Sequence, residues 1–489
     1  MLLSPALVLV GALYATFLAL RYLAQLHHHR KHAKQLHCQP PATGNSSFLG
    51  IPAFLRLHQA VREKRWIDYL CDQFDLHGTT FTQRFLSRKL LTTIEPENVK
   101  AILATQFQDF CLGTRHEQFY PLLGDGIFTL DGAGWSHARG LLRPQFTRDQ
   151  VADLSMLDDH ISHLINLIPK DRSSFDIQRL FFLLTLDSAT HFLFGESVGC
   201  MSPQTTGVLE KSAVRNAQGF ADAFTTAQDY LAARSRAQGL YWVINPKEFR
   251  EANRRVHEVV DHYVNVALEA KRNPDRKPGD GRYIFLEALA EDTDDPKMLR
   301  DNMLNILLAG RDTTASLLSS AFFYLARNQD VFHRLRREIV EEFVLRLQPP
   351  VPVNFRVATK DTSLPVGGGA DRRSPVYVKK GTLVAYNVFS MHRRTDLWGQ
   401  DARTFRPERW EENAKHGWEY LPFNGGPRIC LGQQYALTEA SYTVVRLMQH
   451  FDTLENADPD PRQEPIKQSN LTMMHDHGVP VKLYSLQPL

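Results

Sequence analysis

The chain contains, shortly before its end, the segment Phe423-Asn424-Gly425-Gly426-Pro427-Arg428-Ile429-Cys430-Leu431-Gly432. This segment places one cysteine in a glycine-rich turn. The residues from Leu431 to Phe451 then show helical periodicity, so the positive N-terminal end of that helix is expected to point toward the sulfur of Cys430. Such a position stabilises a thiolate, and a thiolate is a metal ligand. The sequence therefore predicts a metal-binding cysteine at position 430.

Two other features of the segment favour a ligand site. Gly425, Gly426 and Gly432 allow backbone angles and close approaches that other residues would resist. Arg428, two residues before the cysteine, can pair with an anionic group on the ligand that the sulfur holds. The alternative for Cys430 taken alone is a structural role, because free cysteine is among the most buried residue types.

The pattern F-x-x-G-x-R-x-C-x-G, from Phe423 to Gly432, resembles the haem-thiolate loop of cytochrome P450 monooxygenases. The resemblance implies that Cys430 is the axial ligand of a haem b iron and that Arg428 contacts a haem propionate. Phe423 and Gly432 are the other motif positions expected at the cofactor. A thiolate axial ligand favours cleavage of the O–O bond. The implied fold is mainly α with small β-sheets, the cytochrome P450 fold, with an N-terminal transmembrane anchor helix.

A second motif lies in the longest predicted helix, Pro296 to Asn328, and reads A-G-x-D-T-T from Ala309 onward. Glycine costs about 1 kcal/mol relative to alanine in a helix interior, and Asp and Thr are poor helix formers, so these residues indicate function or a kink. The alternative is a glycine for close helix packing, with the polar residues facing water. The pattern resembles the oxygen-activation motif of the same family. The resemblance implies that Asp312 and Thr313 relay protons while Gly310 leaves room for oxygen.

Further residues are expected at the haem propionates. Trp135 and Arg139 are four residues apart and share a helix face, and both side chains can donate hydrogen bonds to a carboxylate. The alternative for this pair is stacking at the surface. The resemblance implies that Arg356 and Arg428 are the other propionate partners.

The segment from Phe405 to Trp410 resembles the meander motif of the family, in which Arg409 joins a Glu and an Arg of an earlier E-x-x-R helix. Arg346 stands at the arginine position, but the residue three positions earlier is Phe343. The preceding helical segment runs directly into this one, which indicates an internal deletion before Val344, as a truncated gene model or splice form would produce. The alternative is a truncated or degenerate family member that binds haem poorly and is non-catalytic.

Composition excludes several other classes of protein. A chain of 489 residues normally forms several domains, but the candidate breaks, Arg272 to Gly281 and Pro365 to Pro375, have motifs on both sides and are expected to be surface loops of one unit. A net charge of +3 is too small to indicate binding to nucleic acid. The five cysteines are scattered and do not form a disulfide framework, and the histidines show no paired spacing typical of zinc sites.

The N-terminus predicts a membrane anchor. Leu2 to Leu20 is largely apolar and uncharged, and as a helix it would span about 28 Å. No basic start or cleavage site is clear, so an uncleaved anchor is favoured over a signal peptide. The basic residues from Arg21 onward place the body in the cytosol. With the resemblance, this implies a single-pass protein of the endoplasmic reticulum membrane. The expected parts are an anchor at 1–21, a basic and proline-containing linker at 22–48 and a haem-thiolate catalytic domain at 49–489.

Periodicity predicts mostly helices with a minority of strands. The expected helices are Asn98 to Ala104, Val151 to Ile168, Asp176 to Phe194, Lys247 to Lys271, Pro296 to Asn328 and Leu431 to Phe451. The expected strands are Thr79 to Phe85, Lys89 to Ile94, Pro375 to Val378 and Thr382 to Tyr386.

The resemblance covers the whole chain and is closest to fungal membrane-bound hydroxylases of n-alkanes and fatty acids. It implies insertion of one oxygen atom from O2 into a C–H bond of a small hydrophobic substrate. No flavin-binding or dinucleotide-binding segment is evident, so the electrons are expected from an NADPH-cytochrome P450 reductase. A peroxide-driven or rearranging haem enzyme is an alternative that the intact oxygen-activation motif disfavours. Substrate contacts are expected from Leu123 to Phe128, Leu308, Ala309, Val351 to Val353 and Leu471 to Met473.

Overall fold

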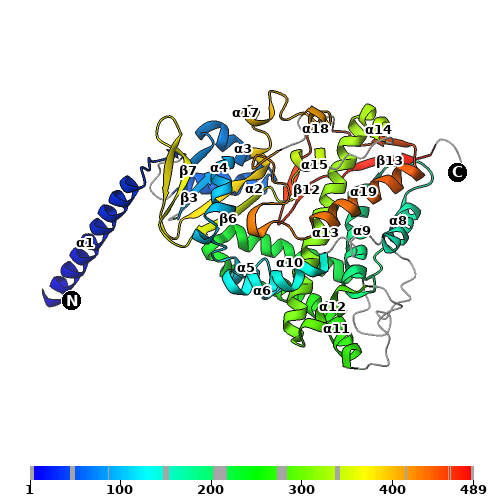
Figure 1. Ribbon diagram of the computed structural model, residues 1–489, viewed down its shortest axis with the longest axis horizontal. Helices are drawn as coiled ribbons and strands as arrows, with labels where there is room; N and C mark the ends of the chain where they lie inside the picture. The colour runs from blue at the N-terminus through cyan, green and yellow to red at the C-terminus, as the bar shows by residue number, and fades with distance from the viewer. Residues whose placement is uncertain are drawn as a thin grey trace. The chain divides into compact units, whose positions relative to one another are not determined.

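The computed structural model describes residues 5–44, 50–85, 88–146, 154–201, 217–272, 283–335, 342–412, 416–460, 462 and 464–485 (Figure 1). Helices predominate in these residues, and the strands form one six-stranded sheet and three smaller sheets. The expectation of a mainly α fold with small β-sheets is therefore confirmed.

The chain divides into two compact units. The sheet unit comprises Met1–Arg56, Cys71–Cys111 and Phe355–Tyr386. The helical unit comprises Leu57–Leu70, Leu112–Asn354 and Asn387–Leu489. Neither of the two candidate breaks, at 272–281 and 365–375, is a boundary between these units, as expected.

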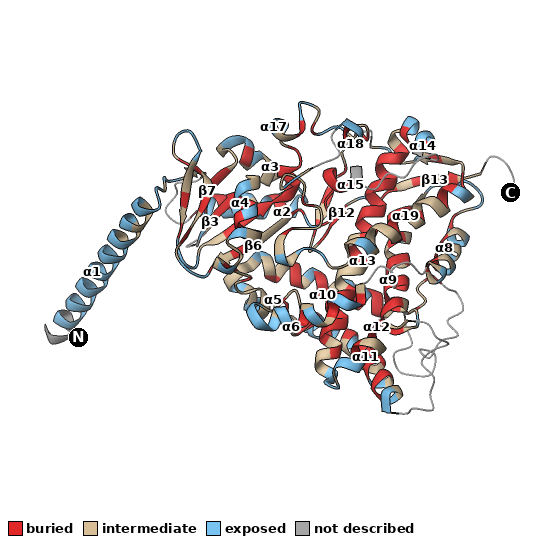
Figure 2. Ribbon diagram, viewed as in Figure 1, coloured by how far each residue is buried: buried red, intermediate tan, exposed pale blue. Residues whose placement is uncertain are grey.

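The sheet unit begins with helix α1, Pro5–Gln35, which is exposed along most of its length (Figure 2). Its segment Leu9–Gln35 is long and apolar enough to cross a membrane. The helix continues past residue 21 through much of the expected linker, because neither glycine nor proline occurs between Ala12 and Gln39. The chain leaves the helix at His37, which has a left-handed φ of +53°.

The main sheet belongs to the sheet unit and has the strand order β1-β2-β3-β9-β6-β4. Strands β2 and β3 form an antiparallel hairpin, β3 pairs in parallel with β9, and β6 pairs antiparallel with β4. A separate antiparallel hairpin joins β7 to β8. The bounds are β1 Ala42–Thr43, β2 Thr80–Phe85, β3 Arg88–Thr93, β4 Phe110–Cys111, β6 Val353–Ala358, β7 Thr362–Gly368, β8 Ser374–Val378 and β9 Leu383–Asn387. Helix α4, Pro96–Lys100, a π-helical turn, Ala101–Thr105, and a 3-10 turn, Phe107–Asp109, connect β3 to β4.

The helical unit carries the remaining elements. Helices α2, Ile51–Arg62, and α3, Trp66–His77, have residues in both units. The helices are α5 Arg115–Leu123, α6 Gly132–Leu142, α8 Ser155–Leu167, α9 Ile177–Phe194, α10 Ala217–Ala237, α11 Lys247–Arg272, α12 Phe285–Asp292, α13 Pro296–Arg327, α14 Gln329–Leu335, α15 Glu342–Leu347, α16 Val388–Met391, α17 Thr395–Trp398, α18 Arg409–Glu412 and α19 Gln433–His450. The small sheets consist of β5 Phe175–Asp176, β10 Thr453–Asn456 and β13 Pro480–Tyr484, and of β11 Lys467–Ser469 with β12 Met473–His475.

Helix α13 is the central helix of the helical unit and is buried over most of its length (Figure 2). It packs against α9, α11 and α19. Asp295 caps its first turn by accepting hydrogen bonds from the N–H groups of Lys297, at 2.9 Å, and Met298, at 3.3 Å. Two clusters of buried apolar side chains both include residues of α13, so its polar motif lies within the core.

Four long helices, α9, α11, α13 and α19, begin and end within two residues of the predicted positions. Asn98 to Ala104 is helical as expected, with α4 ending at Lys100 and a π-helical turn following it. One prediction is wrong. Pro365 to Pro375 is not simply a surface loop, because β7 extends to Gly368 and β8 begins at Ser374. The expected start at Val151 and the loop after Arg272 lie outside the described residues.

Candidate active site

The cysteine loop connects a 3-10 turn, Gly426–Arg428, to the first residue of α19. The N–H of Cys430 donates to the carbonyl of Phe423 at 3.0 Å. Asn424 and Gly426 adopt left-handed backbone angles, with φ of +64° and +67°, as the tight turn requires. Gly432 has a φ of −86°, so it does not share this requirement. The turn holds the sulfur close to the N-terminal end of α19.

Cys430 is exposed, and Ile429 beside it is 42% exposed. Desolvation by the surrounding protein nonetheless raises the pKa of the thiol, while the Gly432 N–H and the charge of Arg139 act in the opposite direction. A thiol in this position is deprotonated when it binds a metal ion.

Three other predicted cofactor residues gather beside this thiol. The guanidinium carbons of Arg428 and Arg139 lie 4.5 and 5.9 Å from the centre of the Trp135 indole ring. Arg139, on α6, is close enough to Cys430 for its charge to act on the thiol. Two guanidinium groups and an indole N–H form a donor set that suits the carboxylates of haem. The residues present therefore fit a haem held by a cysteine.

Arg428 also fixes the cysteine loop to the segment between α5 and α6. Its Nη1 donates to the carbonyl of Ile127 at 3.2 Å, and its Nη2 donates to the carbonyl of Leu130 at 3.0 Å. The same Nη2 contacts Asp131 Oδ1 at 2.7 Å. The side chain of Arg428 is only 9% exposed. Its planar donor group is thus oriented by three oxygen atoms of one short segment.

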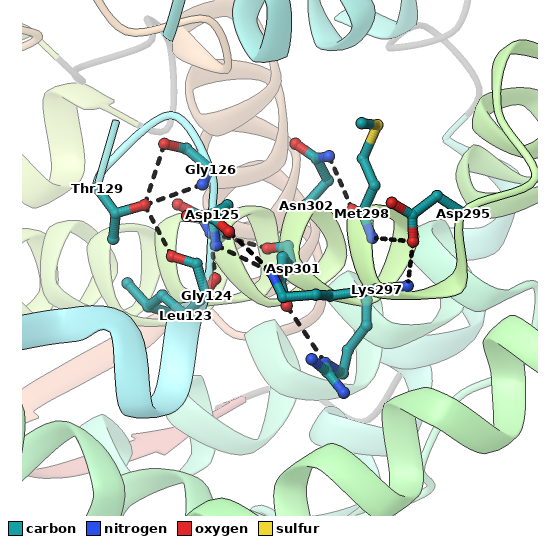
Figure 3. Close-up of polar contacts among 12 residues, drawn as sticks. Leu123, Gly124, Asp125, Gly126, Thr129, Asp295, Lys297, Met298, Asp301 and Asn302 are labelled. Carbon is teal, nitrogen blue, oxygen red and sulfur yellow. Dashed lines mark hydrogen bonds and ion pairs between the residues drawn. The ribbon is translucent and has the colours of Figure 1, made fainter. Parts of the chain in front are cut away.

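That segment is in turn fixed to the first turns of α13 by Asp301 (Figure 3). The N–H of Asp125 donates to Asp301 Oδ2 at 2.9 Å, and Lys297 Nζ donates to the same oxygen at 2.8 Å. Gly124 turns the chain with a φ of +56°, and Thr129 Oγ1 donates to its carbonyl at 2.8 Å. The loop therefore has a defined position on the helix.

Asn305, one turn further along α13, holds the same loop at both ends. Its Nδ2 donates to the carbonyl of Leu123 at 3.0 Å, and its Oδ1 accepts from the N–H of Phe128 at 3.1 Å. The segment expected to contact substrate is thereby attached to the helix that carries Gly310. Sequence reasoning missed Asp301 and Asn305. The available signal was two polar residues, four apart, within a largely apolar helix.

The oxygen-activation motif interrupts the buried stretch of α13. Leu308, Ala309 and Gly310 are only partly buried, whereas the seven residues before them are buried. Among the described atoms, a Cβ on Gly310 would contact only the Cβ of Ala189, at 3.8 Å. Thr313, also partly buried, donates from Oγ1 to the carbonyl of Ala309 at 2.6 Å. The helix therefore has an open face at Gly310, which fits the predicted room for oxygen.

Asp312 lies on the buried side of the same turn and is 6% exposed. Burial raises the pKa of its carboxyl, and the charge of Arg311 partly offsets this effect. Arg311 Nη1 lies 3.6 Å from Asp312 Oδ1, and Arg311 Nη2 donates to Thr225 Oγ1 of α10 at 2.9 Å. A carboxyl with a raised pKa binds a proton more readily, which suits a proton carrier.

A further buried carboxyl lies on α19 and was not identified from the sequence. Glu439 is 3% exposed and accepts a hydrogen bond from Ser188 Oγ of α9. Burial raises its pKa to about 7, against the effect of the hydrogen bond from Ser188. Glu439 thus connects the helix after the cysteine with α9.

The other segments expected to contact substrate meet beside α13. Ser316 Oγ donates to the carbonyl of Met473 at 2.5 Å. The N–H of Met473 donates to the carbonyl of Pro350 at 2.9 Å, directly before Val351. Residues 351–353 and 471–473 therefore lie near one another and near the helix.

Arg356 belongs to the sheet unit, where it is 3% exposed. Its Nη1 donates to the carbonyl of Phe355 at 2.7 Å, and its guanidinium carbon lies 5.7 Å from the centre of the Tyr386 ring. The expected contact of Arg356 with a haem propionate stays a prediction.

Arg346, in α15, occupies the arginine position of the incomplete E-x-x-R motif. It is 2% exposed. Its Nη1 donates to the carbonyls of His392, at 2.7 Å, and Ala402, at 2.6 Å, and its Nη2 donates to the carbonyl of Thr404, at 3.3 Å. Within the described parts of the chain, Arg346 forms no ion pair. The region before it, residues 336–341, lies outside the described residues.

Among the side chains that the structure describes, which exclude those of residues 336–343, no carboxylate pairs with the buried Arg346. Burial, followed by the positive charges of Arg409 and Arg393, lowers the pKa of Arg346 to about 9. Arg409 is better supported, because its Nη2 lies 2.8 Å from Asp401 Oδ1. In the E-x-x-R arrangement, a glutamate would form an ion pair with Arg346, as Asp401 does with Arg409. The described contacts of Arg346 are instead to the carbonyl oxygens of His392, Ala402 and Thr404.

The helical fold and a cysteine loop of this composition define a haem-thiolate protein. The sequence model of the family described as Cytochrome P450 matches residues 46–343 and 340–482. The chain belongs to the cytochrome P450 family.

Relatives from yeasts match over most of their length. Cytochrome P450 52A12 of Debaryomyces hansenii is 47% identical over 483 residues, which cover 92% of this chain and 93% of the relative. Cytochrome P450 52A3-B of Candida maltosa is 44% identical, with 96% and 95% covered. Cytochrome P450 52A5 of Candida maltosa is 51% identical, with 83% and 82% covered.

Membership of this family confirms the expected cofactor and class of reaction. The family uses haem with an axial cysteine thiolate, and the chain is a monooxygenase that requires a redox partner, a substrate and O2. The exposed apolar helix α1 is consistent with a membrane anchor. Coverage of nearly the whole relative argues against the truncated, non-catalytic alternative.

The match nevertheless has a break near Val344. The two matched segments meet at residues 340–343. The alignment with the Debaryomyces hansenii relative runs over 483 positions, whereas 92% of 489 residues is about 450, so about 33 positions have no counterpart in this chain.

Proposed function

We propose that Cys430 is the axial thiolate ligand of the haem and that the chain hydroxylates n-alkanes or fatty acids. The observation that carries the cofactor assignment is the position of the Cys430 thiol beside Arg139, Arg428 and Trp135. When bound, haem supplies the redox chemistry that inserts one atom of O2 into a C–H bond.

The arginines and the tryptophan hold the carboxylate groups of the cofactor. Arg428 keeps its fork in place through the carbonyls of Ile127 and Leu130, so little side-chain entropy is lost when it binds a propionate. Arg139 and Trp135 add two donors from α6, and Arg356 is the fourth partner in this proposal. Phe423 and Gly432 bracket the sulfur at the two ends of its loop.

Proton delivery is assigned to the motif of α13. Asp312 holds a proton because burial raises the pKa of its carboxyl, and Thr313 carries it onward through its hydroxyl group. Thr313 is bonded to the carbonyl of Ala309, so its hydroxyl must turn away from the helix backbone to donate elsewhere. Gly310 leaves the space in which oxygen and the reacting carbon meet.

The substrate assignment rests on the resemblance to fungal hydroxylases and on relatives of the 52A group at 43–51% identity. The segments 123–128, 351–353 and 471–473 are mostly apolar, as a hydrocarbon chain requires. The loop at 123–128 is tethered to α13 through Asp301 and Asn305. In this proposal the tethered loop forms a wall of the substrate pocket, and its tethers keep that wall in one position.

The redox partner in this proposal is NADPH-cytochrome P450 reductase, and the location is the endoplasmic reticulum membrane. A single span at 1–21 leaves Arg21 and the following basic residues on the cytosolic side. Residues 22–48 connect the span to a catalytic domain at 49–489. The same membrane surface then presents the reductase and a hydrophobic substrate to the enzyme.

We also propose that a stretch is missing immediately before Val344, with the E-x-x-R glutamate in it. The divided family match and the surplus of about 33 aligned positions support this reading. Sequencing the transcript across residues 342–344 tests it. An in-frame segment that encodes E-x-x-R supports the proposal, and an uninterrupted genomic reading identical to this chain contradicts it.

Turnover tests the activity. The full chain, reconstituted in lipid nanodiscs with NADPH-cytochrome P450 reductase, is given n-dodecane or lauric acid, and products are identified by mass spectrometry after incubation under labelled oxygen. The proposal predicts hydroxylated product that carries one labelled oxygen atom and depends on the reductase. Haem-loaded enzyme that forms product from neither substrate, while oxidising another class of compound, would overturn the substrate assignment.

A further inference from the structure

Three potential metal ligands meet where α1 approaches the β7–β8 hairpin of the sheet unit (Figure 1). They are His28 and His29, from the last turns of α1, and Asp361, directly before β7. One ligand atom from each residue lies within 4.8 Å of the others. Among the described residues, this is the only such group of histidine, cysteine and carboxylate side chains.

The separations suit a tetrahedral metal ion. Asp361 Oδ2 lies 3.3 Å from His29 Nδ1 and 3.9 Å from His28 Nε2. Metal–ligand bonds of 2.0–2.2 Å in a tetrahedral zinc site place neighbouring ligand atoms about 3.3–3.6 Å apart. Asp361 Oδ2 and His29 Nδ1 already have this spacing. All three ligand atoms lie within 4.8 Å of one another, so His28 must move closer to the other two to bind the same ion. His28 can make that movement because 65% of its side chain is exposed.

The carboxylate is held in place before any metal binds. Tyr377 Oη, on β8, donates to Asp361 Oδ2 at 2.6 Å. The N–H of Lys380 donates to Asp361 Oδ1 at 2.8 Å. Hydrogen bonds of this kind orient ligating carboxylates in known metal sites. Asp361 thus keeps one direction while the two imidazoles approach it.

A third imidazole lies next to the group. His32 follows His28 by one helical turn, and the two rings are stacked with centroids 5.7 Å apart. The ring of His32 also lies 6.2 Å from that of Tyr377. Its Nδ1 is buried and has no hydrogen-bond partner in the described residues. A buried nitrogen with no partner, beside three convergent ligand atoms, is a second observation that points to a bound ion.

We propose that His28, His29 and Asp361 bind a divalent transition-metal ion such as Zn2+, with His32 or water as the fourth ligand. Two imidazoles and one carboxylate favour zinc over magnesium or calcium, which prefer oxygen ligands. The ion links α1 to the loop before β7, and so fixes the direction in which the anchor helix leaves the sheet. The sequence alone did not reveal this site, because its carboxylate lies far from the histidines along the chain.

Zinc binding by the haem-loaded full chain tests the proposal. The protein carries no histidine tag, is stripped with a chelator, and is dialysed against dilute Zn2+ before its metal content is measured by mass spectrometry. We expect one zinc ion per chain, and zinc-edge X-ray absorption that shows imidazole ligands. The reduced carbon-monoxide spectrum of each variant serves as the check of folding.

Single substitutions then separate this site from other histidines. His29→Ala and Asp361→Asn should each weaken zinc binding by about 10-fold or more. His28→Ala should weaken zinc binding to the same extent. Because 65% of the His28 side chain is exposed, this substitution should not disturb folding. His27→Ala is the matched control, because His27 is exposed and lies outside the group.

Two outcomes would overturn the proposal. One is the absence of a stoichiometric zinc ion in the folded wild-type chain, which would leave only ion pairs between the histidines and Asp361. The other is equal zinc binding by the wild type and by His28→Ala, which would place the ion elsewhere.

Discussion

Restoring a carboxylate next to Arg346 should stabilise the protein measurably. Phe343→Glu places a glutamate three residues before Arg346 on α15, which is the spacing of E-x-x-R. Three hydrogen bonds from Arg346 to described carbonyl oxygens leave part of its five-donor fork available. A carboxylate at position 343 can accept from that part.

The magnitude follows from the pKa of Arg346. Burial, followed by the charges of Arg409 and Arg393, lowers this pKa to about 9, so keeping Arg346 charged in the folded protein costs several kcal/mol. Charge-assisted hydrogen bonds contribute about 1.5–3 kcal/mol, so we expect a gain of about 2 kcal/mol and a rise of about 2–4 °C in the midpoint of unfolding.

The pH dependence has a definite sign. Because the pKa of Arg346 is lowered in the folded state, the cost of burying its charge is fully present below pH 9. Above about pH 9 the folded protein releases the proton, and the cost then falls by about 1.36 kcal/mol for each pH unit until the pKa of the unfolded chain is reached. The advantage of Phe343→Glu should therefore be largest near pH 7 and shrink above pH 9.

Phe343→Gln is the matched control, since glutamine has the shape of glutamate without its charge. Thermal unfolding of the two variants, followed by the loss of the thiolate-type Soret band, isolates the effect of the charge. Equal midpoints for the Glu and Gln variants between pH 7 and pH 9 would refute the reasoning about Arg346.

Three further substitutions test the site. Asp312→Asn should lower product formation about 100-fold or more, with NADPH oxidation continuing as hydrogen peroxide release; unchanged coupling of NADPH to product would exclude Asp312 from proton delivery. Arg428→Leu should lower the free energy of unfolding by about 3 kcal/mol and accelerate haem loss. Arg428→Lys keeps the positive charge but loses the planar group of several hydrogen-bond donors. Equal rates of haem loss in wild type and Arg428→Leu would remove that residue from the cofactor site. Asn305→Ala leaves two backbone groups of the adjoining loop without partners and should cost about 1–3 kcal/mol. Asn302→Ala should cost less, because among the described residues Asn302 bonds only to Met298 of its own helix.

Local patterns explain the predictions that the structure confirms. Helix α13 begins at the predicted residue, Pro296, where the N-cap, the N1 proline and the start of the apolar run coincide. It ends one residue before the predicted end. Residues expected near the cofactor also lie close together. The guanidinium groups of Arg428 and Arg139 both lie within 6 Å of the centre of the Trp135 ring, although about three hundred positions separate Arg428 from the other two. That grouping could be expected only from the resemblance, because no local pattern relates α6 to the cysteine loop.

The features that were missed depend on contacts between distant segments. Asn305 attaches a loop through backbone groups, and a single amide in a helix does not reveal which loop it will meet. The anchor helix extends beyond residue 21 because basic residues and histidines continue a helix as well as apolar ones do. Glu439 is buried by α9 and α13, which the periodicity of α19 does not indicate.

The reduced carbon-monoxide difference spectrum of the full chain tests the central claim most directly, because the position of the Soret band reports a thiolate ligand on haem. The account predicts a thiolate-type band for the wild type and for the control Cys71→Ser. It predicts loss of that band in Cys430→His, which can still hold haem through an imidazole. A thiolate-type band that survives in Cys430→His, or its absence from wild-type chain that has taken up haem, would contradict the assignment of Cys430.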